Sequence, residues 1–204
     1  MTGTEHYFTA EPASPDERRT RTVHLAGRDV EVETAGGVFS PDHLDTGTEV
    51  LLRHVPDPPR DGDLLDLGCG WGPVALSLGL LAPHARVWAV DVNERALDLT
   101  RRNAERLGLP GVQAVRPEDV PDDVRFAAVW SNPPIRVGKE TLHAMLRQWL
   151  RRLVPGGEAY LVVAKNLGSD SLLRWLATEL AGAAAVDRVA TARGFRVLRV
   201  VAAD

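Results

Sequence analysis

Two patterns of hydrophobic and polar positions follow one another through most of the chain. Short apolar runs predict buried strands, whereas longer segments with apolar positions three and four residues apart predict amphipathic helices. Runs of the first kind cover residues 64–66, 86–90, 112–115, 126–130 and 158–164. Segments of the second kind lie between or after them, at residues 74–81, 93–107, 140–153 and 171–181. Repeated units of this kind predict a parallel, doubly wound α/β sheet.

The end of the chain departs from this alternation. Residues 185–190 and 195–202 predict two further strands joined at Arg193-Gly194. The hairpin that they form adds an antiparallel strand to the sheet. We therefore predict a Rossmann-like fold with a mostly parallel, seven-stranded sheet and an antiparallel terminal strand.

The first sixty or so residues form a separate region. Residues 1–21 are polar and contain proline, which indicates an N-terminal arm. Residues 22–26 and 29–33 alternate like the strands of a small hairpin, and residues 46–54 predict a short helix with Asp45 or Thr46 as its N-cap. We therefore divide the chain into a flexible arm (1–21), a hairpin and helix extension (22–60) and a main domain (61–204).

Composition narrows the class of protein. The chain has 204 residues, 44% of them hydrophobic, which suits one well-buried domain. It has no apolar stretch of the roughly 18–20 residues that span a bilayer, and its start lacks the features of a signal peptide, so we expect a cytoplasmic protein without membrane contact. The single cysteine, Cys69, excludes an internal disulfide, and the six histidines lack ligand spacing, so we expect no metal. A net charge of −4 disfavours nucleic-acid binding over the whole surface and leaves local basic patches open.

Asn132-Pro133-Pro134, directly after the apolar run 126–130, is the first candidate for chemistry. Two consecutive prolines stiffen the backbone after a buried strand. They leave main-chain carbonyl groups and one amide side chain pointing outward, where these groups can accept hydrogen bonds from a planar NH2 group. Most such tripeptides are plain turns, so the motif has weight only together with a second motif upstream.

The second motif is a glycine-rich turn between a predicted strand and a predicted helix. Its glycines let the backbone turn sharply and approach a ligand at the helix N-terminus. A dinucleotide-binding pattern requires glycine at position 73, where this chain has Pro73, so a nicotinamide cofactor is disfavoured. Together the two motifs predict a methyl-donor site that faces an amine acceptor. The residues of this turn assigned to cofactor binding are Asp66, Gly68, Cys69, Gly70, Trp71 and Gly72.

Carboxylates after neighbouring strands complete the predicted donor site. Asp91 ends the second strand and can accept hydrogen bonds from both hydroxyl groups of an adenosine ribose. Glu118, with Asp119 beside it, can accept from the adenine amine, although an acidic surface loop explains these residues nearly as well. Asp66 can bind the methionine ammonium group, directly or through water. Val92 and Asn132 are also assigned to cofactor binding.

With these motifs the chain resembles a known family. The glycine turn, Asp91 and Asn132-Pro133-Pro134 together are similar to a class I S-adenosylmethionine-dependent methyltransferase. A narrower resemblance, to the single-domain branch of the small-subunit (16S) rRNA guanine-N2 methyltransferases, covers nearly the whole chain. It rests on His6-Tyr7-Phe8, Gly37-Val38-Phe39-Ser40, Leu44-Asp45-Thr46-Gly47, Asn132-Pro133-Pro134-Ile135-Arg136-Val137-Gly138-Lys139 and Gly194-Phe195-Arg196-Val197-Leu198-Arg199.

The resemblance implies S-adenosylmethionine as cofactor, S-adenosylhomocysteine as product, and rRNA or an assembling small ribosomal subunit as partner. It assigns catalysis to Asn132, Pro133 and Pro134. Many Asn-Pro-Pro proteins have an aromatic residue next, whereas this chain has Ile135, so stacking on the acceptor falls to Ile135, Phe39, Trp71 or Trp130. Trp130 lies on a strand and is more simply a core residue. The residues assigned to the substrate are Phe39, Ser40, Ile135, Arg136 and Lys139.

Two alternatives remain open from the residues alone. The same chemistry can serve another acceptor, such as a protein glutamine, an adenine amine or a small metabolite. A different class of protein, a donor-binding module that associates with the ribosome without catalysis, is also possible. Intact donor and acceptor motifs favour an enzyme.

Overall fold

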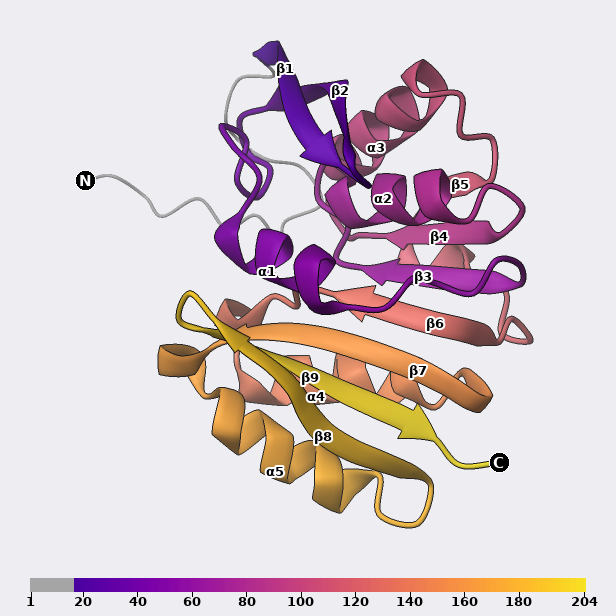
Figure 1. The fold of residues 1–204 in the computed structure, drawn as a ribbon, viewed down its shortest axis with the longest axis vertical. Coiled ribbons are helices and arrows are strands. Elements are labelled where there is room, and N and C mark those ends of the chain that lie inside the picture. The colour runs from indigo at the N-terminus through magenta and orange to yellow at the C-terminus, as the bar shows by residue number, and fades with distance from the viewer. Residues whose placement is uncertain (1–16) are drawn as a thin grey trace.

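Seven strands form the central sheet in the computed structural model, which describes residues 17–204 (Figure 1). His6-Tyr7-Phe8 lies outside the described residues. The strand order is β5-β4-β3-β6-β7-β9-β8, parallel from β5 to β7 and antiparallel at β9 and β8. The predicted fold class is therefore confirmed. The strands are β3 (Asp63–Leu67), β4 (Arg86–Val90), β5 (Val112–Val115), β6 (Phe126–Ser131), β7 (Leu153–Ala164), β8 (Ala184–Ala192) and β9 (Phe195–Ala202).

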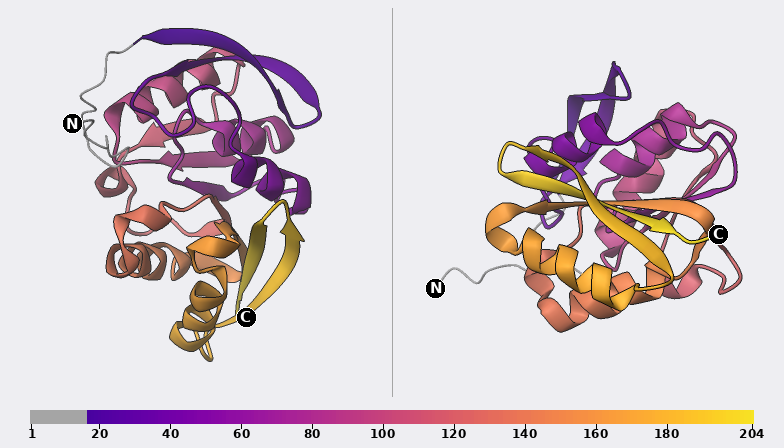
Figure 2. Two further views of the ribbon diagram at one scale, coloured as in Figure 1. Left: turned by 90° about the vertical axis from the view of Figure 1, so that its left-hand side faces the viewer. Right: turned by 60° about the horizontal axis from the view of Figure 1, so that its bottom comes forward.

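Helices cover both faces of this sheet (Figures 1 and 2). Apolar side chains of α1, α2 and α3 pack in the core on one face, and those of α4 and α5 pack in the core on the other. None of the helices in the described part of the chain is long and apolar enough to cross a membrane. The helices are α1 (Thr46–His54), α2 (Pro73–Leu81), α3 (Glu94–Arg106), α4 (Lys139–Leu150) and α5 (Ser169–Glu179), with short 3-10 turns η1 (Pro117–Asp119), η2 (Ile135–Val137) and η3 (Lys165–Leu167).

The boundary between α4 and β7 differs from the prediction. The pattern predicts a helix to residue 153 and a strand from residue 158, whereas α4 ends at Leu150 and β7 begins at Leu153. Gly156 and Gly157 lie inside this strand, beside a register shift in its pairing with β6. Gly157 is packed so closely that a Cβ atom there would lie 2.9 Å from the Val154 carbonyl oxygen. The glycines therefore mark a bulge within a strand and not a loop between two elements.

The N-terminal hairpin is longer than the pattern predicts. β1 (Arg18–Leu25) pairs antiparallel with β2 (Arg28–Ala35), so the first strand begins at Arg18 and not at residue 22, within the segment expected to be an arm. Arg18 forms ion pairs with Glu33 on β2 and Asp98 on α3. The start of this strand is polar and held by charges, which hydrophobic alternation does not reveal.

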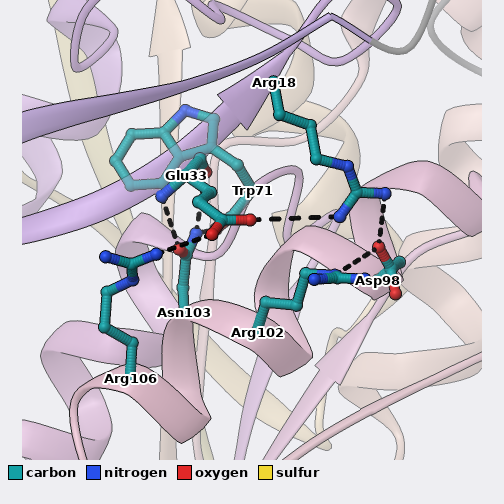
Figure 3. A network of polar contacts seen from close by, with 7 residues as sticks. All are labelled: Arg18, Glu33, Trp71, Asp98, Arg102, Asn103 and Arg106. Carbon is teal, nitrogen blue, oxygen red and sulfur yellow. Dashed lines mark hydrogen bonds and ion pairs between the residues drawn. The ribbon is translucent and has the colours of Figure 1, made fainter.

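Asn103 on α3 joins the hairpin to the main domain, as Figure 3 shows. Its buried Nδ2 donates to the carbonyl oxygens of Glu33 and Trp71, each at 3.0 Å, and its Oδ1 accepts from the Glu33 amide at 2.6 Å. The Glu33 carboxylate in turn accepts from Arg106 at 2.6 Å. One carboxamide thereby ties together β2, α3 and the glycine turn.

We expect Asn103→Ala to lower the free energy of unfolding by about 1–3 kcal/mol, because it leaves buried backbone groups without partners. Urea denaturation measures this difference. Asn166→Ala changes an exposed asparagine in η3 and is the matched control, which should be near neutral. Equal effects of the two substitutions would show that Asn103 does not anchor the hairpin.

Candidate functional site

The two predicted motifs meet at the centre of the sheet. β3 and β6 pair in parallel, with Asp66 opposite Trp130, so the glycine turn and Asn132 leave the sheet at the same edge. Ser131 Oγ donates to the Leu67 carbonyl oxygen at 2.6 Å, and a Cβ atom on Gly68 would lie 3.9 Å from Pro134 Cδ. The strand order changes direction between β3 and β6, which is where ligands bind in open α/β sheets.

The glycine turn takes a shape that only glycine adopts without strain. Gly72 has φ of +98°, in the left-handed region, and is the N-cap of α2. A Cβ atom at Gly72 would lie 2.9 Å from Thr100 Oγ1, which itself donates to the Gly70 carbonyl oxygen at 3.0 Å. Gly68 N and Cys69 N both donate to the Val90 carbonyl oxygen, at 2.8 and 3.1 Å. The turn is thus fixed from α3 on one side and from β4 on the other.

Asp91 stands at the end of β4 with both carboxylate oxygens held by backbone amides. Gly70 N donates to Oδ2 at 2.9 Å, and Asn93 N donates to Oδ1 at 3.0 Å. Each carboxylate oxygen has a second lone pair that can accept a further hydrogen bond. Burial raises the pKa of Asp91, against the opposing effect of these amide donors.

Asp66 has a structural contact that its sequence position does not reveal. Its Oδ2 accepts from the Ala75 amide at 2.8 Å, in the first turn of α2. Gly72 has no side chain to cap this helix, so Asp66 supplies the missing acceptor. Burial, with the nearby charge of Asp91, raises the pKa of Asp66 to about 8. A buried pair of acidic groups of this kind favours a cationic ligand, and S-adenosylmethionine carries a sulfonium and an ammonium group.

Cys69 lies in the turn as a buried thiol. Burial raises its pKa well above the ordinary value, with the carboxylates of Asp91 and Asp66 acting in the same direction. A thiol in this environment stays protonated and is a poor nucleophile.

The loop between β2 and α1 lies on the glycine turn. Trp71 Nε1 donates to the Ser40 carbonyl oxygen at 3.2 Å, and Asn93 Nδ2 donates to the Gly37 carbonyl oxygen at 2.9 Å. The structure thereby brings the predicted substrate residues Phe39 and Ser40 to the donor motif. Phe39 is 43% exposed.

Of the four side chains proposed for stacking, two are core residues. Trp71 and Trp130 are only 2% and 1% exposed, so neither indole presents a face to a ligand. Trp130 is a core residue, as its position on a strand indicates. Phe39 and Ile135 are the two that remain accessible.

Asn132 has its amide nitrogen fixed from the N-terminal extension. Nδ2 donates to Asp45 Oδ2 at 2.8 Å and to Thr48 Oγ1 at 3.2 Å. Pro133 contributes a carbonyl oxygen that already accepts from Ile135 N at 2.8 Å and keeps one lone pair. Asp45 is an N-cap candidate in the sequence and lies in Leu44-Asp45-Thr46-Gly47, one of the segments of the family resemblance, but neither signal assigns Asp45 or Thr48 to the site.

The remaining predicted residues are exposed and follow the ends of β4, β5 and β6 in the sequence. Val92, after Asp91, is 40% exposed. Glu118 and Asp119 are exposed in η1, where the Glu118 carboxylate pairs with Arg116 at 2.7 Å. Arg136 in η2 and Lys139 at the start of α4 are exposed, and neither has an ion-pair partner among residues 17–204. In the same range no group of His, Cys, Asp and Glu side chains is arranged to hold a metal ion.

The sequence matches a known family over most of its length. A family model described as "Methyltransferase small domain" matches residues 29–199. An uncharacterized protein of Bacillus subtilis, YbxB, is 33% identical over 175 residues, which is 84% of this chain and 87% of that protein. Ribosomal RNA small subunit methyltransferase C of Mannheimia succiniciproducens is 38% identical over 143 residues, which is 67% of this chain. The chain spans only 42% of the length of that enzyme.

Solved structures show the same fold. The Thermus thermophilus 16S rRNA N2 G1207 methyltransferase RsmC, in complex with AdoMet and guanosine, superposes with a TM-score of 0.78 at 24% identity. The superposition covers 93% of this chain and 52% of that chain. A methyltransferase from Pyrococcus furiosus gives a TM-score of 0.63 at 22% identity, over 82% of this chain and 89% of that chain.

We expect S-adenosylmethionine to bind more tightly as pH rises towards about 8, where the affinity should level off. Below its raised pKa the Asp66 carboxyl group is protonated, and a cationic ligand favours the ionised form, so binding releases a proton. Calorimetry at pH about 7 in two buffers of different ionisation enthalpy measures this release. Asp66→Asn is the control because it still accepts from Ala75 N but cannot ionise. Any proton released by the amino group of S-adenosylmethionine is the same for the wild type and for Asp66→Asn. Identical proton release by the two proteins would therefore contradict the assignment of the titration to Asp66.

We also expect Gly72→Ala to abolish donor binding, since the new Cβ atom would lie 2.9 Å from Thr100 Oγ1. Gly108→Ala is the matched control, because Gly108 also has positive φ, +66°, but a Cβ atom there meets nothing within 4 Å. Each substitution introduces left-handed strain of roughly 1–2 kcal/mol, and only the first displaces the turn. Binding of S-adenosylmethionine by Gly72→Ala with ordinary affinity would contradict this.

Proposed function

The chain belongs to the methyltransferase small domain family of S-adenosylmethionine-dependent enzymes, and we propose that it methylates the exocyclic N2 amine of a guanine in small-subunit rRNA. The observation that carries this proposal is the state of the Asn132 side chain. Both hydrogens of its NH2 group have acceptors, in Asp45 and Thr48, which leaves Oδ1 as the group that meets a substrate. An oxygen that accepts hydrogen bonds, close to the glycine turn that binds the methyl donor, suits a planar amine as substrate.

The proposed chemistry follows from these acceptors. A guanine amine is a poor nucleophile because its lone pair is delocalised into the ring. Hydrogen bonds from this amine to Asn132 Oδ1 and to the free lone pair of the Pro133 carbonyl would favour a pyramidal nitrogen, and Pro134 keeps the backbone rigid. Bound S-adenosylmethionine supplies the electrophilic methyl group, so a nitrogen–carbon bond forms as the carbon–sulfur bond breaks.

The rate would come mainly from holding the acceptor in place. Positioning of this kind contributes up to roughly 7–11 kcal/mol in well-oriented reactions. The proton can leave the methylated amine for water after transfer, so no strong general base is needed. The remaining product is S-adenosylhomocysteine.

We assign the donor site to the residues around the glycine turn. Asp91 would accept from the ribose hydroxyls with the lone pairs that Gly70 N and Asn93 N leave free, and exposed Val92 would contact the adenine. Asp66 would face the cationic end of the donor, while Glu118 and Asp119 would approach the adenine amine. The rest of the methyl donor would contact backbone atoms of the glycine turn, namely those of Gly68, Cys69, Gly70, Trp71 and Gly72.

We assign the acceptor side to residues of the loop before α1 and of the segment after Asn132. Phe39 and Ile135 are accessible and apolar, so they would pack on the guanine, with Ser40 beside them. Arg136 and Lys139 have no ion-pair partner in the described part of the chain, and they would contact the phosphates. A paired guanine would first have to leave its stack to reach this site.

Relatives support an rRNA substrate. Several proteins similar to this chain carry the name ribosomal RNA small subunit methyltransferase C, and the RsmC structure was determined with AdoMet and guanosine. We therefore propose rRNA or an assembling small subunit as the partner, and the cytoplasm as the compartment. The chain spans only part of the length of those relatives.

The test is methyl transfer from labelled S-adenosylmethionine to unmodified small-subunit rRNA, both naked and in assembled subunits, followed by digestion and mass spectrometry. We expect a single N2-methylguanosine. Asn132→Ala should lower the transfer rate by about 100-fold or more while donor affinity stays within about threefold, as for other groups that stabilise a transition state. Gln148→Ala, an exposed amide on α4, is the control.

Other outcomes point elsewhere. Donor binding without transfer to either RNA would contradict the rRNA assignment, and the acceptor would then be sought among protein glutamines, adenine amines and small metabolites. Transfer unaffected by Asn132→Ala would contradict the proposed role of Asn132. Donor binding without transfer to any of these acceptors would indicate the non-catalytic module.

A further inference from the structure

We infer that Asp45, assisted by Thr48, is a positioning residue that sets the orientation of the Asn132 amide and so determines which atom faces the acceptor. This inference rests on the proposed methyl transfer. A carboxamide can be turned by 180° with little change in shape, and the two orientations present either an acceptor oxygen or a donor nitrogen. Only the first orientation can receive a hydrogen bond from an amine.

Asp45 decides between these two orientations. Its Oδ2 lies 2.8 Å from Asn132 Nδ2, and the same oxygen accepts from the Thr48 amide at 3.1 Å. A carboxylate only accepts hydrogen bonds, so the nitrogen of Asn132, and not its oxygen, must face Asp45. Thr48 Oγ1, at 3.2 Å from Nδ2, is placed to take the second hydrogen.

The Asp45 carboxylate is itself held in place by the start of α1. Asp45 is the N-cap of this helix, where the helix dipole and free amides favour a negative group. A Cβ atom at Gly47 would lie 2.9 Å from Asp45 Oδ2 and 2.9 Å from Phe195 Cε1 on β9. The first turn of α1 therefore sits against β9 so closely that only glycine fits, and this fixes the position of the carboxylate.

The consequence is that the N-terminal extension completes the acceptor site. Asp45 and Asn132 lie 87 positions apart in the sequence. α1 packs on β7 and β9, so it delivers the carboxylate to the end of β6 from outside the strand–helix repeats. A purely structural role of Asp45, as a helix cap, is the competing explanation.

The first experiment separates the two roles with Asp45→Ser. Serine is a good N-cap and preserves α1, but its shorter side chain cannot reach Asn132. We expect kcat to fall by about tenfold or more, as when one oriented hydrogen bond is lost, with donor affinity and melting temperature close to those of the wild type. Asp42→Ser, an exposed carboxylate in the same loop that pairs with Arg21, is the control. Loss of stability or donor affinity without a fall in kcat would overturn the inference.

Two further measurements make the result specific. If Asp45 acts through Asn132, then adding Asp45→Ser to Asn132→Ala should lower kcat no further, whereas full additivity of the two losses would overturn the inference. In Asp45→Asn the Thr48 amide, which donates to the same oxygen that Asn132 contacts, should keep the new amide oxygen facing Asn132, so this variant should recover most of the activity that Asp45→Ser loses. A loss as large as that of Asp45→Ser would contradict an orientation role.

A third readout needs no acceptor and separates this inference from the proposed function. In ¹⁵N-labelled protein, the side-chain NH2 signal of Asn132, assigned by its absence in Asn132→Ala, should exchange slowly with water in the wild type. Exchange should become fast in Asp45→Ser. Protection lost in Asp45→Ser while rRNA is not methylated would refute only the rRNA assignment. Unprotected NH2 protons in the wild type would refute the role of Asp45.

Discussion

The parallel pairing of β3 with β6 is the constraint on which the site depends. These strands are neighbours in the sheet although a long stretch of chain separates them, and their carboxyl ends carry the glycine turn and Asn132. Ser131 Oγ locks the two ends together through the Leu67 carbonyl oxygen. Each motif alone is an ordinary turn, and their juxtaposition places the proposed donor site beside the proposed acceptor site.

Near the ends of these strands, side-chain carboxamides and carboxylates hold the loops in place through hydrogen bonds to backbone groups. Asn103 joins the hairpin to the glycine turn, Asn93 caps α3 and holds the loop at Gly37, and Asp91 holds both Gly70 and Asn93. These bonds are made to main-chain groups whose positions the fold has already set. The site is therefore preorganised, which is what catalysis by positioning requires.

The sequence predicts the sheet well because its strands are apolar runs that become buried, and the helix 46–54 also agrees with the structure. The predicted boundaries are wrong at Arg18, where ion pairs extend a polar strand, and at Gly157, where a glycine bulge lies inside β7. The two site motifs come together as predicted. The contact between Asp45 and Asn132 is invisible in the sequence, because it depends on the tertiary packing of α1. The hydrogen bond from Ala75 N in α2 to Asp66 on β3 is hidden as well, because it depends on how the glycine turn places α2 against the end of β3.

The most direct test is a crystal structure of the protein with S-adenosylhomocysteine and guanosine. We predict that the N2 amine lies about 3 Å from Asn132 Oδ1, within hydrogen-bond distance, while Nδ2 stays on Asp45. A guanosine whose amine contacts other groups, or an Asn132 amide whose nitrogen faces the nucleoside, would contradict it.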